Sequence, residues 1–391
     1  MSYTQLLKNN KILRQISLIQ LFAYFGAWFS HVAIYTLLVK FEASALQISL
    51  VVAMNFLPSI ILSVISGSLV DRLPLKKFMI SLLSVEVIMT LMFFYISDIN
   101  DIYLLMILLF IRMAAASIFF TSEMTLLPKI LDEKLLSKAN EIHSIIWSFT
   151  FTAGMALGGI VVHNFGVNVA FTIDILFFVC AIVIFINTKI QIPFTSTTQH
   201  IFDDIKDGLV YIKNNKKLIH YMILHASVGF TSFDSLVTML AGYEYKNIIS
   251  IALAIGITNA TRAAALMIGP FFITNWINKK RLFYLFIIQG LSIVIWGLLQ
   301  HNFYFALLGV FLTGLVTTTL WSYTYAMLQE EIEQKYLGRV LSYNEMTFMS
   351  FNIFTTLFIG FMATFVSLDI ITFMLGGAFI LTALYYKRIF L

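Results

Sequence analysis

The feature that most limits the fold of this chain is a series of long apolar stretches along its whole length. A stretch of about 20 apolar residues can cross a bilayer as a helix. In hydrocarbon each backbone amide needs a partner within its own segment, so we expect helices. Twelve spans are predicted, at residues 15–39, 46–70, 76–97, 102–126, 139–162, 166–187, 217–242, 249–275, 282–300, 303–328, 340–363 and 368–388.

The composition supports a membrane protein. Of the 391 residues, 60% are hydrophobic and 12% are charged, whereas about a quarter of a soluble domain is charged. The strict alternation of apolar and polar residues that marks a β-barrel is missing. The single cysteine, Cys180, offers no disulfide and no cysteine metal site. We therefore predict an all-α membrane protein, with the first apolar stretch retained as a helix.

The distribution of lysine and arginine predicts the orientation. With the N-terminus in the cytoplasm, 21 of the 25 basic residues lie on the cytoplasmic side, Lys40 and Lys246 lie outside, and Arg112 and Arg262 lie within the membrane. This asymmetry obeys the positive-inside rule. We expect a multi-pass protein of the cell inner membrane with both termini cytoplasmic. Because the basic residues are scattered through short loops, we expect the lipid bilayer and not nucleic acid as their partner.

The two halves of the chain resemble each other at a nearly constant spacing. The segment 9–13 matches 214–218 at an offset of 205, and Gly159 matches Gly360 at an offset of 201. This repeat predicts two pseudo-symmetric six-helix bundles, 1–187 and 217–391, around a central cavity that opens alternately to each side. Residues 188–216 are expected to form a cytoplasmic linker with an amphipathic helix, lying on the membrane surface or merely solvated.

The loop after the second span carries a recognisable motif, with Gly67, Asp71, Arg72, Lys76 and Lys77 in order. It resembles the cytoplasmic signature of the major facilitator superfamily. Over its whole length the chain is similar to the branch of twelve-helix drug and siderophore exporters that includes macrolide efflux proteins. These five residues would form a cytoplasmic gate, in which the Asp pairs with a base or with helix-end amides. Alternatively, they only set the orientation.

The resemblance implies a secondary active transporter that exports a small organic compound in exchange for protons. It implies no enzymatic activity, and we expect a monomer without a cofactor. The seven histidines are dispersed, so no metal site is predicted, and no phosphate-binding loop for an ATP-driven pump is present. Two alternatives stay open. One is a uniporter or importer of a metabolite, and the other is a membrane receptor or scaffold without transport.

Polar residues inside the spans are the candidate site residues, because burying them in a bilayer is costly. Helical spacing places them in stripes on single helix faces. The resemblance implies that the first, fourth, seventh and tenth helices line the cavity. The predicted substrate cavity comprises Gln20, Tyr24, His31, Arg112, Phe119, Glu123, His225, Ser232, Thr318, Trp321 and Tyr325.

Glu123, Arg112 and Asp234 are the candidates for proton coupling. We hypothesise that Glu123 and Arg112 form a charge-linked pair, while a structural bond from Arg112 to carbonyls or to Glu86 is the alternative. His225 and Asp234 are about half a turn out of phase on a straight helix, so His225 is expected to face the cavity alone. The helices that carry Glu86 and Asp174 are peripheral in the family, and we expect these two acids to make structural pairs. Arg262 receives no role.

Overall fold

The protein is represented by a computed structural model that describes residues 3–62, 70, 73–131, 133–189 and 201–391. The α-helices in these residues are α1 (Tyr3–Asn9), α2 (Lys11–Lys40), α3 (Ala45–Ala53), α5 (Leu75–Met92), α6 (Ile102–Ile130), α7 (Glu133–Phe165), α8 (Val167–Asn187), α9 (Ile201–Asn214), α10 (Lys216–Ala226), α11 (Asp234–Tyr243), α12 (Ile251–Ile273), α13 (Leu282–Leu299), α14 (Phe303–Glu331), α15 (Leu337–Met362) and α16 (Leu368–Phe390). Short 3-10 helices are η1 (Phe93–Tyr95), η2 (Ile99–Asp101), η3 (Ser227–Thr231) and η4 (Gln334–Tyr336).

Twelve helical spans within the described residues are long and apolar enough to cross a membrane. This confirms the predicted all-α fold with twelve spans. Most bounds agree closely with the prediction, as for the sixth span at Val167–Asn187. The first and eleventh spans begin earlier, at Lys11 and Gln334. Their first turns carry basic and polar residues, which a search for apolar stretches leaves out.

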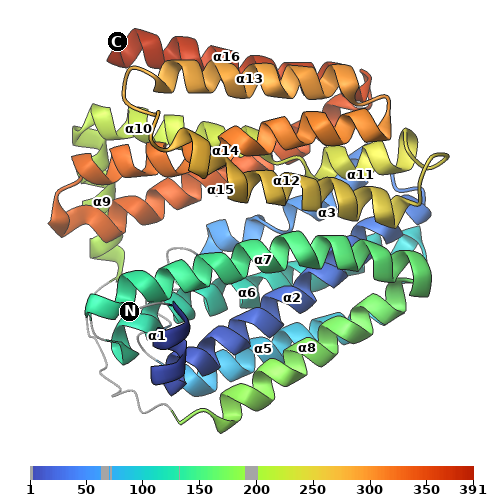
Figure 1. The fold of residues 1–391 in the computed structure, drawn as a ribbon, viewed down its shortest axis with the longest axis horizontal. Coiled ribbons are helices and arrows are strands. Elements are labelled where there is room, and N and C mark those ends of the chain that lie inside the picture. The colour runs from blue at the N-terminus through green and yellow to red at the C-terminus, as the bar shows by residue number, and fades with distance from the viewer. Residues whose placement is uncertain (1–2, 63–69, 71–72, 132, 190–200) are drawn as a thin grey trace.

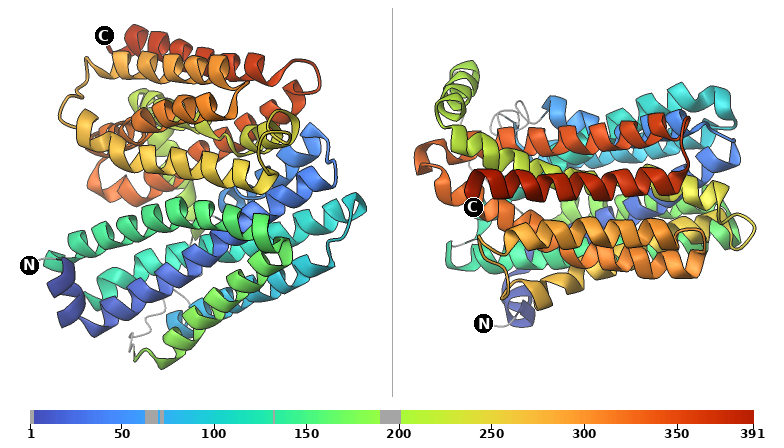
Figure 2. Two further views of the ribbon diagram at one scale, coloured as in Figure 1. Left: turned by 45° about the vertical axis from the view of Figure 1, so that its right-hand side comes forward. Right: turned by 90° about the horizontal axis from the view of Figure 1, so that it is seen from above.

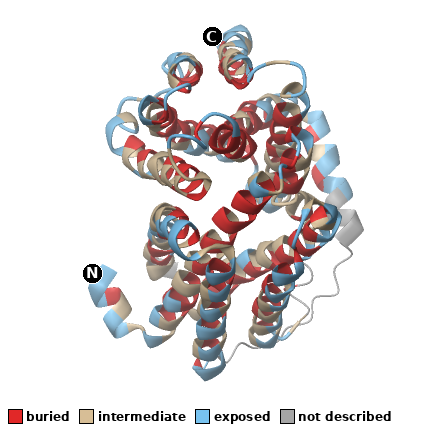
Figure 3. Ribbon diagram, turned by 90° about the vertical axis from the view of Figure 1, so that its right-hand side faces the viewer, coloured by how far each residue is buried: buried red, intermediate tan, exposed pale blue. Residues whose placement is uncertain are grey.

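The spans form two bundles (Figure 1). In the N-terminal bundle α2 packs against α7 and α8, and in the C-terminal bundle α13 packs against α14 and α16. Figure 2 shows the long helices running in roughly the same direction. Both chain ends lie at one end of the molecule, which we call the terminal face, and the opposite end is the far face. Seen onto the far face, buried residues gather on the inner sides of the helices (Figure 3).

Two pairs of helices cross between the bundles, α7 with α12 and α3 with α15. Glycines permit both contacts. A Cβ atom added to Gly159 of α7 would lie 2.8 Å from the carbonyl oxygen of Ala252, and one added to Gly360 of α15 would lie 2.8 Å from that of Ala45. Small residues allow helices to approach this closely. Each glycine stands near the C-terminal end of a helix that begins at the terminal face, so both seams close the far face.

The seventh span is broken, contrary to the continuous helix predicted over 217–242. α10 ends at Ala226, the 3-10 helix η3 follows, and α11 begins at Asp234. Within the break, side-chain hydroxyls donate hydrogen bonds to backbone carbonyls, as the hydroxyl of Thr231 does to the carbonyl of Val228. Arg262 of α12 donates a hydrogen bond of 2.5 Å to the carbonyl of Thr231. A buried partner therefore satisfies a carbonyl that the regular helix would have used.

The second span also departs from a regular helix. α3 ends at Ala53, Met54–Phe56 form a turn, and residues 57–62 are helical again. Pro58 lacks an amide hydrogen, and its ring would clash with the carbonyl four residues earlier in a regular helix, which explains the turn. The amide of Asn55 in this turn donates a hydrogen bond of 2.8 Å to the hydroxyl of Tyr35.

The helix expected between the bundles is present as α9. Its residue Tyr211 stacks on Tyr336 with ring centroids 4.1 Å apart, and Asp207 lies 3.8 Å from Arg339 of α15. These contacts attach α9 to the start of α15 at the terminal face.

Candidate functional site

A cavity of about 210 Å³ lies within the membrane-spanning part of the N-terminal bundle. Aromatic and other apolar side chains make up most of its wall, and a few polar and charged groups lie among them. All of its lining residues come from the first five spans: Tyr24, Ala27, Trp28, His31, Ile34, Tyr35, Asn55, Glu86, Leu109, Arg112, Met113, Ala116 and Trp147. Of the predicted cavity residues, Tyr24, His31 and Arg112 thus share one wall.

Arg112 forms an ion-pair cluster with two buried acids. Its Nη2 atom donates a hydrogen bond of 2.7 Å to Asp174 Oδ2, and its Nε atom lies 3.8 Å from Glu86 Oε2. Ser30 donates a hydrogen bond to the same oxygen of Asp174. The guanidinium also lies over the rings of Phe93 and Phe178. Three helices are therefore joined through one cation, and the expectation that Glu86 and Asp174 make structural pairs agrees with this geometry.

Glu123 is separate from that cluster, which corrects the hypothesis that it pairs with Arg112. The two residues share a helix face but are three turns apart, a rise of about 16 Å along the axis, and the stripe argument ignored this rise. Glu123 is 1% exposed and accepts a hydrogen bond from the Tyr24 hydroxyl. Close by, the Gln20 amide lies 2.7 Å from His143 Nδ1. The acid is therefore held by polar groups of α2 and not by the arginine.

Asp234 reaches across the boundary between the bundles. Its Oδ2 atom lies 3.9 Å from Nε2 of His31, and both side chains are less than one-fifth exposed. Arg262, which also stacks on Phe233 with 5.1 Å to the ring centroid, holds the break just before Asp234. A straight helix could not present both His225 and Asp234 inward, but the break rotates α11 relative to α10. Asp234 is not among the residues that line the cavity, but it contacts His31, which is.

His225 belongs to an aromatic cluster in the C-terminal bundle. Its ring centroid lies 5.3 Å from those of Trp321 and Tyr325, which stack on each other at 5.2 Å. His225 is fully buried, its Nδ1 atom lies 3.1 Å from the Thr324 hydroxyl, and Trp321 is 36% exposed. This cluster is not part of the wall of the cavity described above. It forms a second, aromatic surface on the other bundle.

The remaining predicted cavity residues make local contacts. Phe119 is 2% exposed and lies in the apolar core of the N-terminal bundle. The hydroxyl of Ser232 lies 3.1 Å from that of Thr356, and Thr318 donates a hydrogen bond of 2.8 Å to the Leu266 carbonyl. These contacts join helices within their own bundles.

The predicted cytoplasmic gate is described only in part. Gly67, Asp71 and Arg72 lie outside the described residues. Lys76 donates two hydrogen bonds of 2.8 Å, to the carbonyls of Ile186 and Thr188, and Lys77 is exposed. Lys76 therefore caps the end of α8, where a cation also interacts favourably with the helix dipole.

Sequence reasoning missed several residues of the cavity wall. Trp28 and Tyr35 extend the face of α2 that already carries Tyr24 and His31, so the same helical spacing could have found them. Asn55 and Trp147 stand on the second and fifth spans, which the resemblance does not place at the cavity. His143, beside Gln20, stands on the fifth span as well.

Comparisons with known proteins agree with this architecture. The family described as the Major Facilitator Superfamily matches residues 16–292. Macrolide efflux protein A of Streptococcus pyogenes is 24% identical over 323 residues, which cover 79% of this chain and 79% of that protein.

Solved transporters share the fold. The nucleoside transporter NupG superposes with a TM-score of 0.75 at 12% identity, over 97% of this chain and 98% of that one. A bacterial homologue of the iron transporter ferroportin in an inward-facing state gives a TM-score of 0.75 at 14% identity, over the same shares of the two chains. At such low identity these likenesses concern the fold alone.

Proposed function

Because this chain belongs to the Major Facilitator Superfamily, and is therefore a secondary transporter and not an enzyme, we propose that it exports a small organic compound in exchange for protons. The observation that carries the proposal is a cavity with buried carboxyl groups, Glu86 in its wall and Glu123 behind it, beneath a seam closed by Gly159 and Gly360. A solute can enter such a cavity from one side of the membrane while the other side is closed.

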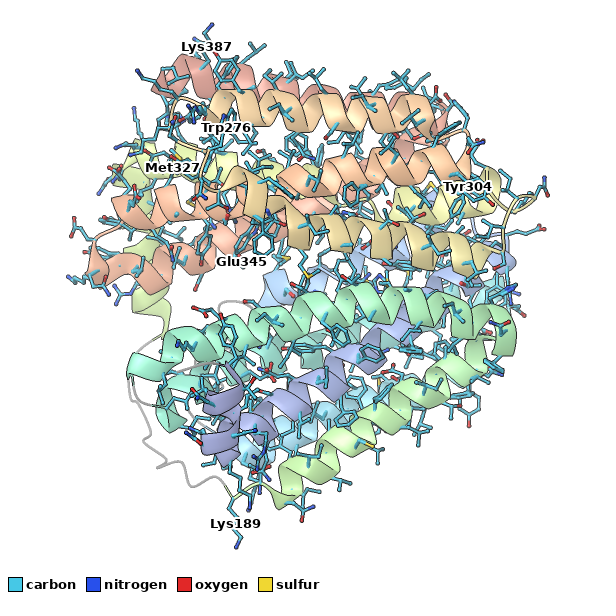
Figure 4. All side chains as sticks on the ribbon, in the orientation of Figure 1. Lys189, Trp276, Tyr304, Met327, Glu345 and Lys387 are labelled. Carbon is cyan, nitrogen blue, oxygen red and sulfur yellow. The ribbon has the colours of Figure 1, made fainter. Side chains whose placement is uncertain are left out.

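We assign the terminal face to the cytoplasm. The basic residues of the loops support this, and Figure 4 places Lys189 and Lys387 at that end and Tyr304 at the other. With this assignment the structure is closed toward the outside. Trp147, in the cavity wall, is 42% exposed, and Trp321 on the opposite bundle is partly exposed as well. Both side chains would meet a solute that enters from the cytoplasm.

Export, as opposed to uptake, is supported by the likeness to macrolide efflux protein A, at 24% identity. The aromatic wall made by Tyr24, Trp28 and Trp147 suits an apolar or aromatic solute. We propose that this solute contacts the wall of the N-terminal bundle and the stacked pair Trp321 and Tyr325 of the C-terminal bundle.

Proton coupling is supported by the buried acids. Glu123 has no salt bridge among the described residues, so protonation changes its charge without breaking an ion pair. Asp234 is placed where a change in its charge would act on the contact between the bundles. Arg112 forms ion pairs with Glu86 and with Asp174, and we assign it the role of holding these two acids in place.

The test is transport by the purified full-length protein in proteoliposomes, with a radiolabelled macrolide as the first probe. We expect uptake into vesicles when an inwardly acidic pH gradient is imposed on inside-out protein, and loss of that uptake when the gradient is collapsed. Glu123→Gln should abolish gradient-driven uptake while substrate exchange without a gradient persists.

Other outcomes would separate the alternatives. Flux that ignores the pH gradient would contradict proton coupling and favour a uniporter. If no compound of a broad panel is moved, the export proposal fails. A strain that lacks the protein should also become more sensitive to the exported compound.

A further inference from the structure

Tyr24 stands between the cavity and the buried acid Glu123. Its side chain lines the cavity, and its hydroxyl donates a hydrogen bond to Glu123 Oε2. Glu123 itself is 1% exposed and is not part of the cavity wall. A proton that passes from Glu123 into the cavity therefore meets the Tyr24 hydroxyl first.

The second carboxyl oxygen of Glu123, Oε1, has different surroundings from the oxygen that Tyr24 contacts. Glu123 Oε1 is buried and has no hydrogen-bond partner among the described residues. An ionised carboxylate with one oxygen unpaired in a low-dielectric site is costly, so the negative charge of Glu123 would be poorly compensated here. The groups around it are Tyr24 and Gln20 of α2, His143 of α7, which lies 2.7 Å from the Gln20 amide, and, farther away, Glu86 of α5. Tyr24 is the one among them that both contacts Glu123 and lines the cavity, which makes it the route for the proton of the acid.

The repeat supports a special role for this acid. In the C-terminal bundle the spacing of 201 that relates Leu127 to Leu328 places Thr324 opposite Glu123. Thr324 contacts His225, which corresponds to Gln20. His225 and Thr324 of the C-terminal bundle therefore correspond to Gln20 and Glu123, and a neutral threonine stands where the N-terminal bundle has a carboxyl group. A purely structural polar network would not need that difference.

From this arrangement we propose that Tyr24 relays the Glu123 proton to the cavity, an inference that rests on the proposed proton-coupled transport. When Glu123 is protonated the hydrogen bond reverses, so that the Glu123 O–H donates to the Tyr24 oxygen and the Tyr24 hydroxyl turns toward the cavity. Glu123 then gives its proton to the Tyr24 oxygen while the hydroxyl releases its own proton to a water or a solute base in the cavity. Tyr24 is neutral before and after the step, and one proton leaves the acid. When a solute covers Tyr24, this exit is blocked, which links solute binding to the protonation of Glu123.

The test is infrared difference spectroscopy of the reconstituted full-length protein during a rapid change from H₂O to D₂O. The carboxyl band of Glu123 is identified by its loss in Glu123→Gln. In Tyr24→Phe we expect the exchange of this proton to slow on the order of a hundredfold, the size of a lost general acid–base contribution. The control is Tyr245→Phe, which removes a hydroxyl that donates 2.7 Å to the Gln300 carbonyl in the other bundle and should leave the exchange rate unchanged.

Two further measurements keep the result clear. Incorporation of 3-fluorotyrosine at position 24 keeps the ring and the hydrogen bond but changes the acidity of the hydroxyl, and the exchange rate should change with it. Unchanged exchange in both Tyr24 variants overturns the relay. The spectroscopic test needs no transported compound, so it stands even if transport fails. If transport works but Tyr24→Phe retains full proton-driven uptake, the relay is wrong and the proposed function survives.

Discussion

His31 of α2 lies 3.9 Å from Asp234 of α11, and this contact joins the two bundles beside the cavity. His31 is part of the cavity wall, whereas Asp234 follows directly after the break in the seventh span. The pair thus joins a span of the N-terminal bundle to a span of the C-terminal bundle. A solute that contacts His31 would therefore act on the closure of the far face.

Removing this cross-bundle attraction should weaken the closed far face. In Asp234→Asn we expect faster labelling of a cysteine in the cavity wall, Ala27→Cys, by a membrane-impermeant maleimide added from the far side. The reason is that the neutral amide removes the negative charge that faces the His31 ring across the boundary between the bundles. His301→Ala, which removes a solvent-exposed partner of Glu244, is the control and should leave the labelling rate unchanged. Equal labelling in Asp234→Asn and in the parent would contradict the prediction.

The two glycine seams give a second prediction. A valine at position 360 or 159 would place its Cβ atom about 2.8 Å from a backbone carbonyl of the facing helix, where nothing can move aside without a shift of the helix. We expect Gly360→Val to favour the state open at the far face, and Gly159→Val to do the same.

Gly377→Val is the matched control for these two variants, because no atom lies within 4 Å of an added Cβ there. Binding of the two variants to a conformation-selective nanobody raised against the closed far face would measure the effect. Unimpaired binding of both seam variants would mean that the seams do not set the state.

The Arg112 cluster should determine the stability of the N-terminal bundle. Removing one partner of a buried ion pair costs about 3–5 kcal/mol. Asp174 makes the 2.7 Å bond to Arg112, whereas Glu86 stays 3.8 Å away. Asp174→Ala should therefore lower the thermal unfolding temperature in detergent strongly. Glu330→Ala, whose side chain is 70% exposed, is the control, and a solvent-exposed pair contributes at most about 1 kcal/mol. Equal unfolding temperatures for the two variants would show that the cluster is not structural.

The stacked pair on the C-terminal bundle should affect solute binding and not coupling. Trp321→Ala removes a partly exposed ring that faces the proposed solute path. We expect a higher KM for the transported compound, with the number of protons moved per solute unchanged. A loss of coupling with unchanged KM would place this residue in the proton path instead.

The sequence predicts the fold well because the signals are local. Apolar length identifies the spans, and the repeat pairs Gly159 with Gly360, which the structure places at two equivalent seams. The turn before Pro58 has a local cause in the proline itself, whereas the break around Thr231 depends on Arg262, a residue from another helix. Long-range partners of this kind leave no periodic pattern in a single sequence.

The sequence predicted the helix face on which a site residue lies, but not its depth in the membrane or its partner. Spacing grouped Tyr24 with His31 on one face, and both line the cavity. It also grouped Arg112 with Glu123, but the two lie at different depths along the helix, and Arg112 pairs with Asp174 instead. Which acid an arginine binds depends on how helices from distant parts of the sequence are arranged, and stripes on one helix do not contain that information.

Alternating access of the two bundles is the central claim, and spin-label distances test it most directly. One label pair reports on the far face at the exposed residues Lys40 and Lys246, and the other on the terminal face at Asn140 and Ser342. When the pH is changed or the transported compound is added, we expect the far-face distance to lengthen while the terminal-face distance shortens. Two distances that stay fixed, or that lengthen and shorten together, would contradict the account.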